Sequence, residues 1–280
     1  MIKAISYWSM PEGLSGRCPV TSAITLAKNA GFQGLELAIA QDGVLATTTD
    51  QATCQRYRDD LASAHIVCTS VASGMSWGVS PTHPDPAVRA KAIALHQAAL
   101  QRAAWLGASA LLFVPGAVRI PWDDSYGPVD YAQAVEWARQ AVTALLPTAQ
   151  ATGVNLCLEN VWNGLFYSPL EFRDFVDSFH SPHLGVYLDV GNLLGYHQHP
   201  PHWISTLGPR IRRVHLKDFK NRIGGMAGFC DLMAGDVPWT ATMQALRAIG
   251  YNNTLVAEMM PLDPALLART SAAMDIILGL

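Results

Sequence analysis

The stretch GVYLDVGN, from Gly185 to Asn192, places an acid directly after a short apolar run. The pattern is typical of a buried strand that ends at Asp189, and Gly191 follows two residues later. Moving a carboxylate away from water at the end of such a strand is costly unless a partner compensates its charge. The rest of the chain must therefore supply that partner.

Short apolar runs alternate with longer amphipathic segments along the whole chain. Several of the apolar runs are continuous, as expected for strands that are covered on both faces. Strands that alternate with helices predict a parallel sheet, and eight such units predict a closed (β/α)8 TIM barrel. The predicted strands are residues 2–8, 32–39, 66–72, 110–116, 154–159, 184–189, 211–217 and 254–259.

The segments between these strands carry signals for the start and end of helices. Asp85-Pro86 combines a capping residue with proline at the first helical position, and residues 168–171 have the form of a capping box. Gly31, Gly153 and Gly250 stand where a helix should end before the next strand. These signals support the alternation of strands and helices.

An open doubly wound sheet is the alternative fold. That fold usually has a glycine-rich phosphate turn after its first strand, but residues 9–17, SMPEGLSGR, do not match G-x-G-x-x-G. The chain also shows no linker, low-complexity tract or shift in composition. We therefore expect residues 1–280 to form a single TIM-barrel domain.

Composition excludes several classes of function. Half of the 280 residues are hydrophobic, and the net charge of −3 predicts no general attraction to nucleic acid or to anionic membranes. No apolar run approaches the ~18 residues of a membrane span, and the first residues lack a secretion signal. The five cysteines are odd in number and form no C-x-x-C pair. This favours reduced thiols in a cytoplasmic protein.

Four consecutive predicted strands end in polar residues, namely Glu159, Asp189, His215 and Glu258. Each residue alone is more often a helix cap, a salt-bridge partner or a buried hydrogen-bonded group. The carboxyl ends of barrel strands converge at one mouth, however, and three carboxylates gathered there would raise each other's pKa values. A divalent cation removes that repulsion, so we expect Asp189 to face a metal.

The donor set narrows the choice of metal. Three carboxylates and one imidazole suit Mn²⁺ best, with Mg²⁺, Co²⁺ and Zn²⁺ as alternatives. No cysteine belongs to the set, which disfavours a closed structural zinc site. A six-coordinate ion would keep two positions open, and two neighbouring oxygens of a sugar would fill them.

Four segments carry a resemblance to a known family: LCLEN (156–160), GVYLDVGN (185–192), RRVHLKDFK (212–220) and LVAEMMP (255–261). They resemble the sugar isomerase/epimerase superfamily of xylose isomerase-like barrels. Within it, HLKDFK and FCDLMAGDVPW (229–239) are most similar to the L-xylulose 5-phosphate 3-epimerase branch. D-tagatose 3-epimerases are more distant.

The resemblance implies a Glu/Asp/His/Glu metal site, which maps onto Glu159, Asp189, His215 and Glu258. It further implies that the two glutamates act as acid and base in a 3-epimerisation of ketoses or ketose phosphates, through a metal-stabilised enediolate. A homodimer or homotetramer is expected, with a small sugar or sugar phosphate as substrate and no nucleic acid or membrane partner.

One departure concerns the substrate. Epimerases of the tagatose type carry histidine three residues after the aspartate, whereas this chain has Asn192, as the phosphopentulose branch does. Asn192 is a candidate to hydrogen-bond a sugar hydroxyl, and so is Asn160, which directly follows the first glutamate. Trp8 ends the first predicted strand and is a candidate wall of the pocket, although aromatic residues there are also ordinary barrel packing.

Two cations are further candidates for substrate binding. Lys217 lies two residues after His215, on the same face of an extended strand, and Arg222 follows in the next loop. A solvated loop, or a salt bridge to Asp218, explains these cations equally well. Glu36 lies inside the second predicted strand, where it is either part of the site or a buried structural acid.

Other functions fit the same sequence less well. An aldose–ketose isomerase, or a dehydratase or lyase acting on a keto-sugar or cyclitol, would need the same metal and base. A nuclease of the endonuclease IV type needs extra histidines, but the second and third strands end in LAI and SVAS. A non-catalytic sugar-binding barrel would be expected to have lost a metal ligand, and all four are present.

Overall fold

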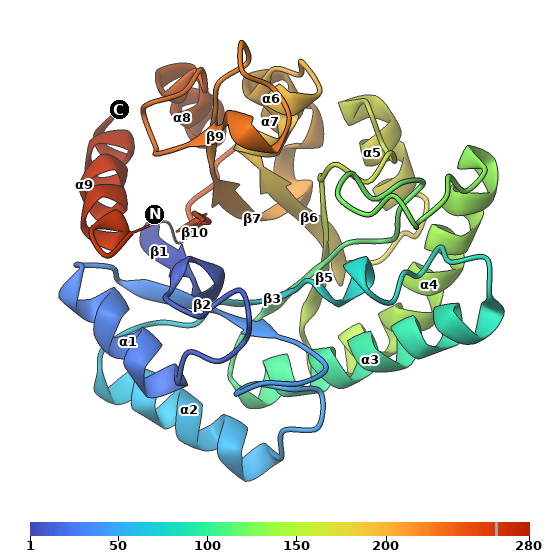
Figure 1. Cartoon of the computed structure of the whole chain (residues 1–280), viewed down its shortest axis with the longest axis horizontal. Helices are drawn as coiled ribbons and strands as arrows, with labels where there is room; N and C mark the ends of the chain where they lie inside the picture. The colour runs from blue at the N-terminus through green and yellow to red at the C-terminus, as the bar shows by residue number, and fades with distance from the viewer. Residues whose placement is uncertain (261–262) are drawn as a thin grey trace.

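Eight parallel strands close into a barrel in the computed structural model, which describes residues 1–260 and 263–280 (Figure 1). Their order around the barrel is β1-β10-β7-β6-β5-β4-β3-β2. The predicted (β/α)8 barrel is therefore confirmed. The strands are β1 Ile2–Ser6, β2 Gly34–Ile39, β3 Ser70–Ser73, β4 Ala110–Phe113, β5 Asn155–Glu159, β6 Leu184–Asp189, β7 Ile211–Leu216 and β10 Thr254–Ala257.

Helices surround the barrel and separate its strands along the chain (Figure 1). A small antiparallel pair, β8 Asp218–Phe219 and β9 Phe229–Cys230, follows β7. Within the ranges that the structure describes, no helix is both long and apolar enough to cross a membrane. The α-helices are α1 Val20–Asn29, α2 Gln51–Ser63, α3 Pro86–Trp105, α4 Tyr131–Thr152, α5 Pro169–Asp177, α6 Val190–Gly195, α7 Pro200–Leu207, α8 Trp239–Ala248 and α9 Leu266–Gly279.

The predicted caps begin and end these helices. The Asp85 carboxylate accepts the Ala87 N–H at 2.8 Å at the start of α3, and the Ser168 hydroxyl accepts the Glu171 N–H at 3.2 Å at the start of α5. Gly153 ends α4 with a φ of 70°, a left-handed conformation that costs glycine little. Local signals therefore set these helix boundaries.

The largest differences from the predicted strand boundaries occur in the third and fourth strands. The third strand begins at Ser70 rather than at residue 66, because Val67 is 42% exposed and makes only an isolated bridge to Gly34. The fourth strand ends at Phe113 rather than at residue 116. Gly116 turns away with a φ of 121°, and a Cβ there would lie 2.3 Å from the Thr82 side chain.

Alternating side chains divide the buried residues into two layers. The main core packs between the barrel strands and the helices, while a smaller cluster fills the inside of the barrel. Towards the amino ends of the strands, Arg213 donates to the Thr69 carbonyl at 2.9 Å and to the Ser109 hydroxyl at 2.6 Å. The smaller cluster consists of Ala72, Ala110, Leu112, Val114, Cys157 and Tyr187.

The two ends of the chain meet where the barrel closes. The Lys3 ammonium group of β1 lies 2.6 Å from the Asp275 carboxylate and 3.0 Å from the Ser271 hydroxyl, both on α9. Figure 1 shows β1 and α9 side by side. These contacts attach the last helix to the first strand, which pairs with β10. Glu258 directly follows β10.

Candidate active site

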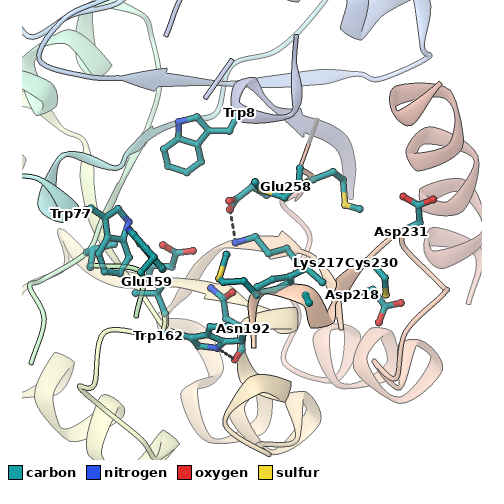
Figure 2. Close-up of a pocket in the computed structure, with 18 of the residues that line it drawn as sticks. Trp8, Trp77, Glu159, Trp162, Asn192, Lys217, Asp218, Cys230, Asp231 and Glu258 are labelled. Carbon is teal, nitrogen blue, oxygen red and sulfur yellow. Dashed lines mark hydrogen bonds and ion pairs between the residues drawn. The ribbon is translucent and has the colours of Figure 1, made fainter. Parts of the chain in front are cut away.

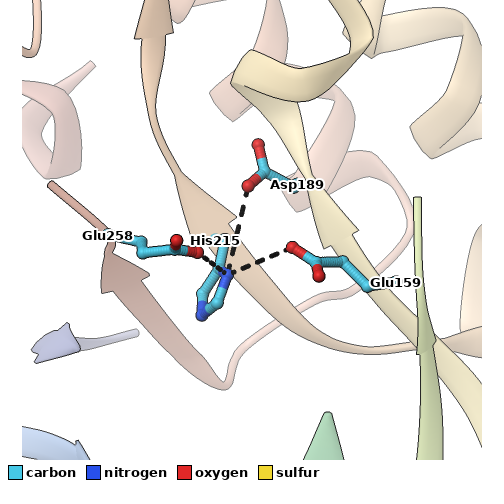
Figure 3. Close-up of side chains that lie close together, drawn as sticks. All are labelled: Glu159, Asp189, His215 and Glu258. Carbon is cyan, nitrogen blue, oxygen red and sulfur yellow. Dashed lines mark ion pairs between the residues drawn. The ribbon is translucent and has the colours of Figure 1, made fainter. Parts of the chain in front are cut away.

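The four predicted metal ligands gather at the carboxyl ends of the strands (Figure 3). Glu159 and Asp189 end β5 and β6, His215 is the last but one residue of β7, and Glu258 directly follows β10. Asp189 pairs with His215 in the register of β6 and β7. One ligand atom from each of the four residues lies within 4.8 Å of the others.

The geometry of this cluster fits a cation. The His215 Nδ1 atom lies 2.7 Å from Glu258 Oε2, 3.6 Å from Glu159 Oε1 and 4.0 Å from Asp189 Oδ2. Three of these buried atoms, Asp189 Oδ2, His215 Nδ1 and Glu258 Oε2, make no well-aligned hydrogen bond, although the Lys217 ammonium group lies within ion-pair distance of the two carboxylate oxygens. Buried polar atoms without hydrogen bonds are costly, and here they converge on one point. A divalent ion bound there would satisfy all of them.

The protonation of the carboxyl groups depends on burial and on neighbouring charges. Burial raises the pKa of Glu159 to about 7 and raises the pKa of Asp189 above its usual range. Burial also acts to raise the pKa of Glu258, but the positive charges of Lys217 and His215 outweigh it and lower that pKa to about 2. A divalent cation would favour the ionised form of all three carboxyl groups.

Glu36 fixes the orientation of the histidine. Its Oε1 atom lies 2.8 Å from His215 Nε2, on the side of the ring away from the other ligands. The Ser70 hydroxyl donates to Glu36 Oε2 at 2.8 Å, and the Tyr187 hydroxyl donates to the same oxygen. Metal-binding histidines commonly use their second nitrogen in this way. Burial acts to lower the pKa of His215, but Glu36 and Glu258 raise it well above its usual value.

Lys217 lies against two of the candidate ligands. Its Nζ atom is 2.9 Å from Asp189 Oδ2 and 3.0 Å from Glu258 Oε2, and Figure 2 shows the second contact. Burial acts to lower the pKa of Lys217, but these carboxylates raise it above its usual range. Gly191 leaves room for the lysine, because a Cβ there would lie 2.5 Å from Lys217 Cβ.

The two asparagines differ in what they contact. Asn160 exchanges two hydrogen bonds with the backbone of Asp189, at 2.7 and 2.8 Å, and is absent from the lining of the cavity. Asn192 lines the cavity, and its N–H donates to Asp189 Oδ1 at 2.9 Å. Asn160 thus holds the strand end that carries Asp189, while Asn192 can reach a bound molecule.

A cavity of about 490 Å³ opens above the cluster. Glu159, Lys217 and Glu258 are among its polar lining residues, and Trp8 and Trp77 lie at its wall (Figure 2). Its volume is typical of sites for small molecules, which range over ~300–1,000 Å³. Arg222 is exposed and is not one of the described residues that line this cavity.

Several residues of the site were not singled out from the sequence. Tyr187 precedes Asp189 by two residues, so the alternation of side chains along β6 places both on the same face. That spacing was available as a signal. The lining residues Trp122 and Trp162 lie in loops after β4 and β5, where no local pattern shows which way a side chain points.

Two curated relatives of the chain are named as 3-epimerases, one of them putative. It is 27% identical over 206 residues to D-psicose 3-epimerase of Ruminiclostridium cellulolyticum, a match that covers 70% of this chain and 65% of that enzyme, just under two thirds. It is 25% identical over 247 residues to the putative L-ribulose-5-phosphate 3-epimerase SgbU of Escherichia coli, covering 84% of this chain and 82% of the relative.

Solved structures and a family model extend the comparison to the whole barrel. The crystal structure of D-psicose 3-epimerase with D-tagatose from Clostridium cellulolyticum superposes with a TM-score of 0.81 at 20% identity, covering 99% of this chain and 98% of that one. The model of the xylose isomerase-like TIM barrel family matches residues 24–274. The protein is therefore a member of the xylose isomerase-like TIM barrel family.

Proposed function

We propose that this protein is a metal-dependent ketose 3-epimerase in which Glu159 and Glu258 act as acid and base. The observation that carries the proposal is the convergence of Glu159, Asp189, His215 and Glu258 at the mouth of the barrel, with one ligand atom of each within 4.8 Å of the others. Two curated relatives are named as 3-epimerases of ketoses, which supports the same reaction class.

Glu159, Asp189, His215 and Glu258 would hold the cation, with Mn²⁺ as the first choice for this donor set. When bound, the ion would supply positive charge that stabilises the negative charge on a ketose as the neighbouring carbon loses its proton. Lys217 would compensate part of the negative charge of Asp189 and Glu258 on the side that faces the cavity.

Glu159 and Glu258 are suited to opposite halves of the reaction. Both line the cavity, and they come from β5 and from the residue after β10, with β6 and β7 between them. One carboxylate would take the proton from one face of the sugar, and the other would return a proton to the opposite face, which inverts C3. General acid–base steps of this kind contribute ~10²–10⁴-fold to rate.

An exchange experiment tests the proposal. We expect the Mn²⁺-loaded protein in D₂O to incorporate deuterium at C3 of a ketose, and Glu258→Gln to lower that rate by at least about 10²-fold. Glu136→Gln, on the exposed face of α4, is the matched control and should exchange like the wild type. Circular dichroism and bound Mn²⁺ would be measured for both variants.

The position of the label separates the competing reactions. Deuterium at C1 or C2 would indicate aldose–ketose isomerisation, and loss of water would indicate a dehydratase or lyase. Exchange at the wild-type rate in folded Glu258→Gln would remove this residue from the chemistry. Absence of exchange with every ketose would contradict the proposed reaction itself.

A further inference from the structure

The charge of the cavity is unsuited to a phosphate group. Lys217 is the one cationic side chain among the described lining residues, and both of its close partners are carboxylates. Pro261 and Leu262, which lie outside the described residues, add no charge. Besides the two proposed catalytic glutamates, the acidic residues Asp218 and Asp231 are among the lining residues. A phosphorylated sugar would therefore enter a predominantly acidic space.

In the loop after β7, a carboxylate of the protein itself, that of Asp218, occupies the donors that could otherwise bind a phosphate. Phosphate in TIM barrels commonly binds at the loops that follow the last two strands. Here the buried Asp218 carboxylate accepts the Val237 N–H at 3.1 Å and the Trp239 Nε1–H at 3.0 Å, just before and at the start of α8. These donors are consequently engaged within the protein.

In the loop before α9, a carboxylate of the protein likewise occupies the local hydrogen-bond donors and the nearby cation. The Asp263 carboxylate accepts the Ala265 N–H at 2.8 Å and pairs with Arg269 at 2.9 Å. Arg269 also contacts Asp231 at 3.0 Å, so its charge is shared between two acids. The positive charge of Arg269 is thus already compensated within the protein.

The mouth of the cavity is apolar instead. Trp77 and Trp122 pack edge to face with their ring centres 4.6 Å apart, and Trp122 is 52% exposed. Met226 and Met260 also line the cavity while being 50% and 46% exposed. Exposed apolar side chains gathered at a cavity mark a binding surface, and tryptophan and methionine offer large and adaptable contact areas.

We propose that the substrate is an uncharged ketose that carries an apolar group at the end remote from its reacting carbons. This inference rests on the proposed epimerase function for the position of the reacting carbons. The ketose end would lie at Glu159, Lys217 and Glu258, and the apolar group would lie between Trp77, Trp122 and Met226.

A matched series of ligands tests this inference. The series consists of one ketohexose, its 6-phosphate, its 6-deoxy analogue and its 6-O-benzyl ether, which differ only at the remote carbon. We expect the benzyl ether to exceed the free ketohexose by at least about 10-fold in kcat/KM for deuterium exchange, the scale of one good contact in an apolar pocket, and the phosphate to be the poorest.

Binding is measured separately from turnover. Quenching of intrinsic tryptophan fluorescence by the same four compounds, with Mn²⁺ present, reports affinity because several tryptophans line the cavity. If none of the four compounds exchanges but the ether still binds best, the proposed epimerase reaction is contradicted and the proposed class of ligand is supported. A preference for the phosphate, equal affinity across the series, or no binding at all overturns the inference.

A pair of variants locates the apolar group. Trp122→Ala should reduce the preference for the benzyl ether over the free ketohexose by about 10-fold. Leu170→Ala removes a comparably exposed side chain, 54%, outside the cavity lining and should keep the full preference. An unchanged preference in folded Trp122→Ala would show that the apolar group does not lie at this tryptophan.

Discussion

The two halves of the barrel contribute different chemistry to one site. The four candidate metal ligands come from β5, β6 and β7 and from the residue after β10, all in the second half of the chain. The segments after β1, β3 and β4 supply Trp8, Trp77 and Trp122, which form part of the apolar wall of the cavity. The candidate metal ligands thus all come from the second half of the chain, whereas the first half adds tryptophans to an apolar wall that also includes Trp162, Met226 and Met260 of the second half.

Two buried histidines show how the halves differ. Neither side chain is exposed, but His96 in α3 faces the Ala92 carbonyl at 2.8 Å and the Ser73 hydroxyl at 3.0 Å, both of them neutral groups. Burial lowers the pKa of His96 to about 4, whereas carboxylates raise that of His215. The same residue type is structural where its neighbours are neutral and becomes a candidate ligand where they are acidic.

The largest effect is expected in the second half. Asp189→Asn keeps an acceptor for the Asn192 N–H but removes one negative charge from the cluster. We expect Mn²⁺ affinity to fall sharply and ketose exchange to drop by at least about 10³-fold, because a bound ion contributes several kcal/mol of charge stabilisation. Isothermal titration with Mn²⁺ and the exchange assay measure the two effects.

Asp60→Asn, on the exposed face of α2, is the control for that change. Wild-type Mn²⁺ affinity in Asp189→Asn would remove Asp189 from the ligand set. It would also contradict the view that the metal ligands come from the second half of the barrel.

A smaller effect is expected from the one acid of the first half that reaches the site. Glu36→Gln retains an acceptor for His215 Nε2 but loses the charge that orients the ring. Mn²⁺ affinity should fall by about 10–100-fold, as for other groups that support a metal-binding histidine. Titration of the metal alone measures this without reference to turnover.

Glu12→Gln, in the exposed loop after β1, should bind Mn²⁺ like the wild type. Equal affinity in Glu36→Gln would mean that the first half shapes the cavity only. Metal binding would then depend on residues of the second half alone.

The smallest effect concerns stability. His96 has a folded-state pKa of about 4, below the ordinary value of 6.5, so the unfolded chain binds more protons between these pH values. The stabilisation is full above pH ~6.5 and is lost as the pH falls towards ~4. Lowering the pH from about 7.5 to 5.5 should cost roughly 1 kcal/mol through this residue.

Urea unfolding of the metal-free protein at these two pH values measures that loss. In His96→Gln the dependence on pH should be weaker by the same amount, while the other titrating groups remain as in the wild type. An identical slope in wild type and variant would show that the burial of His96 does not govern its titration.

Much of the site was predictable from local patterns. Apolar runs that end in an acid or histidine revealed the strand ends, and the closed parallel barrel follows from their number and alternation with helices. Glu159, Asp189, His215 and Glu258 were named from that argument, and the structure brings all four together. Tyr187 was within reach of the same reasoning, since it shares a face with Asp189.

Other features depend on packing between distant segments. Glu36 meets His215 across 179 positions of sequence, and only closure of the barrel brings β2 towards β7. Lys217 and Arg222 are both cations in one short segment, yet the first is buried against two carboxylates and the second is exposed. Loop conformation decides between them, and their local composition carries no such information.

By itself, therefore, the sequence determined the barrel and the four candidate metal ligands, because side-chain periodicity and strand ends are local properties of the chain. The tertiary structure alone decided that Trp122 lines the mouth, that Asp218 binds the Val237 and Trp239 donors, and that Glu36 supports His215. Those facts depend on distances between segments far apart in sequence, which are set when the barrel closes.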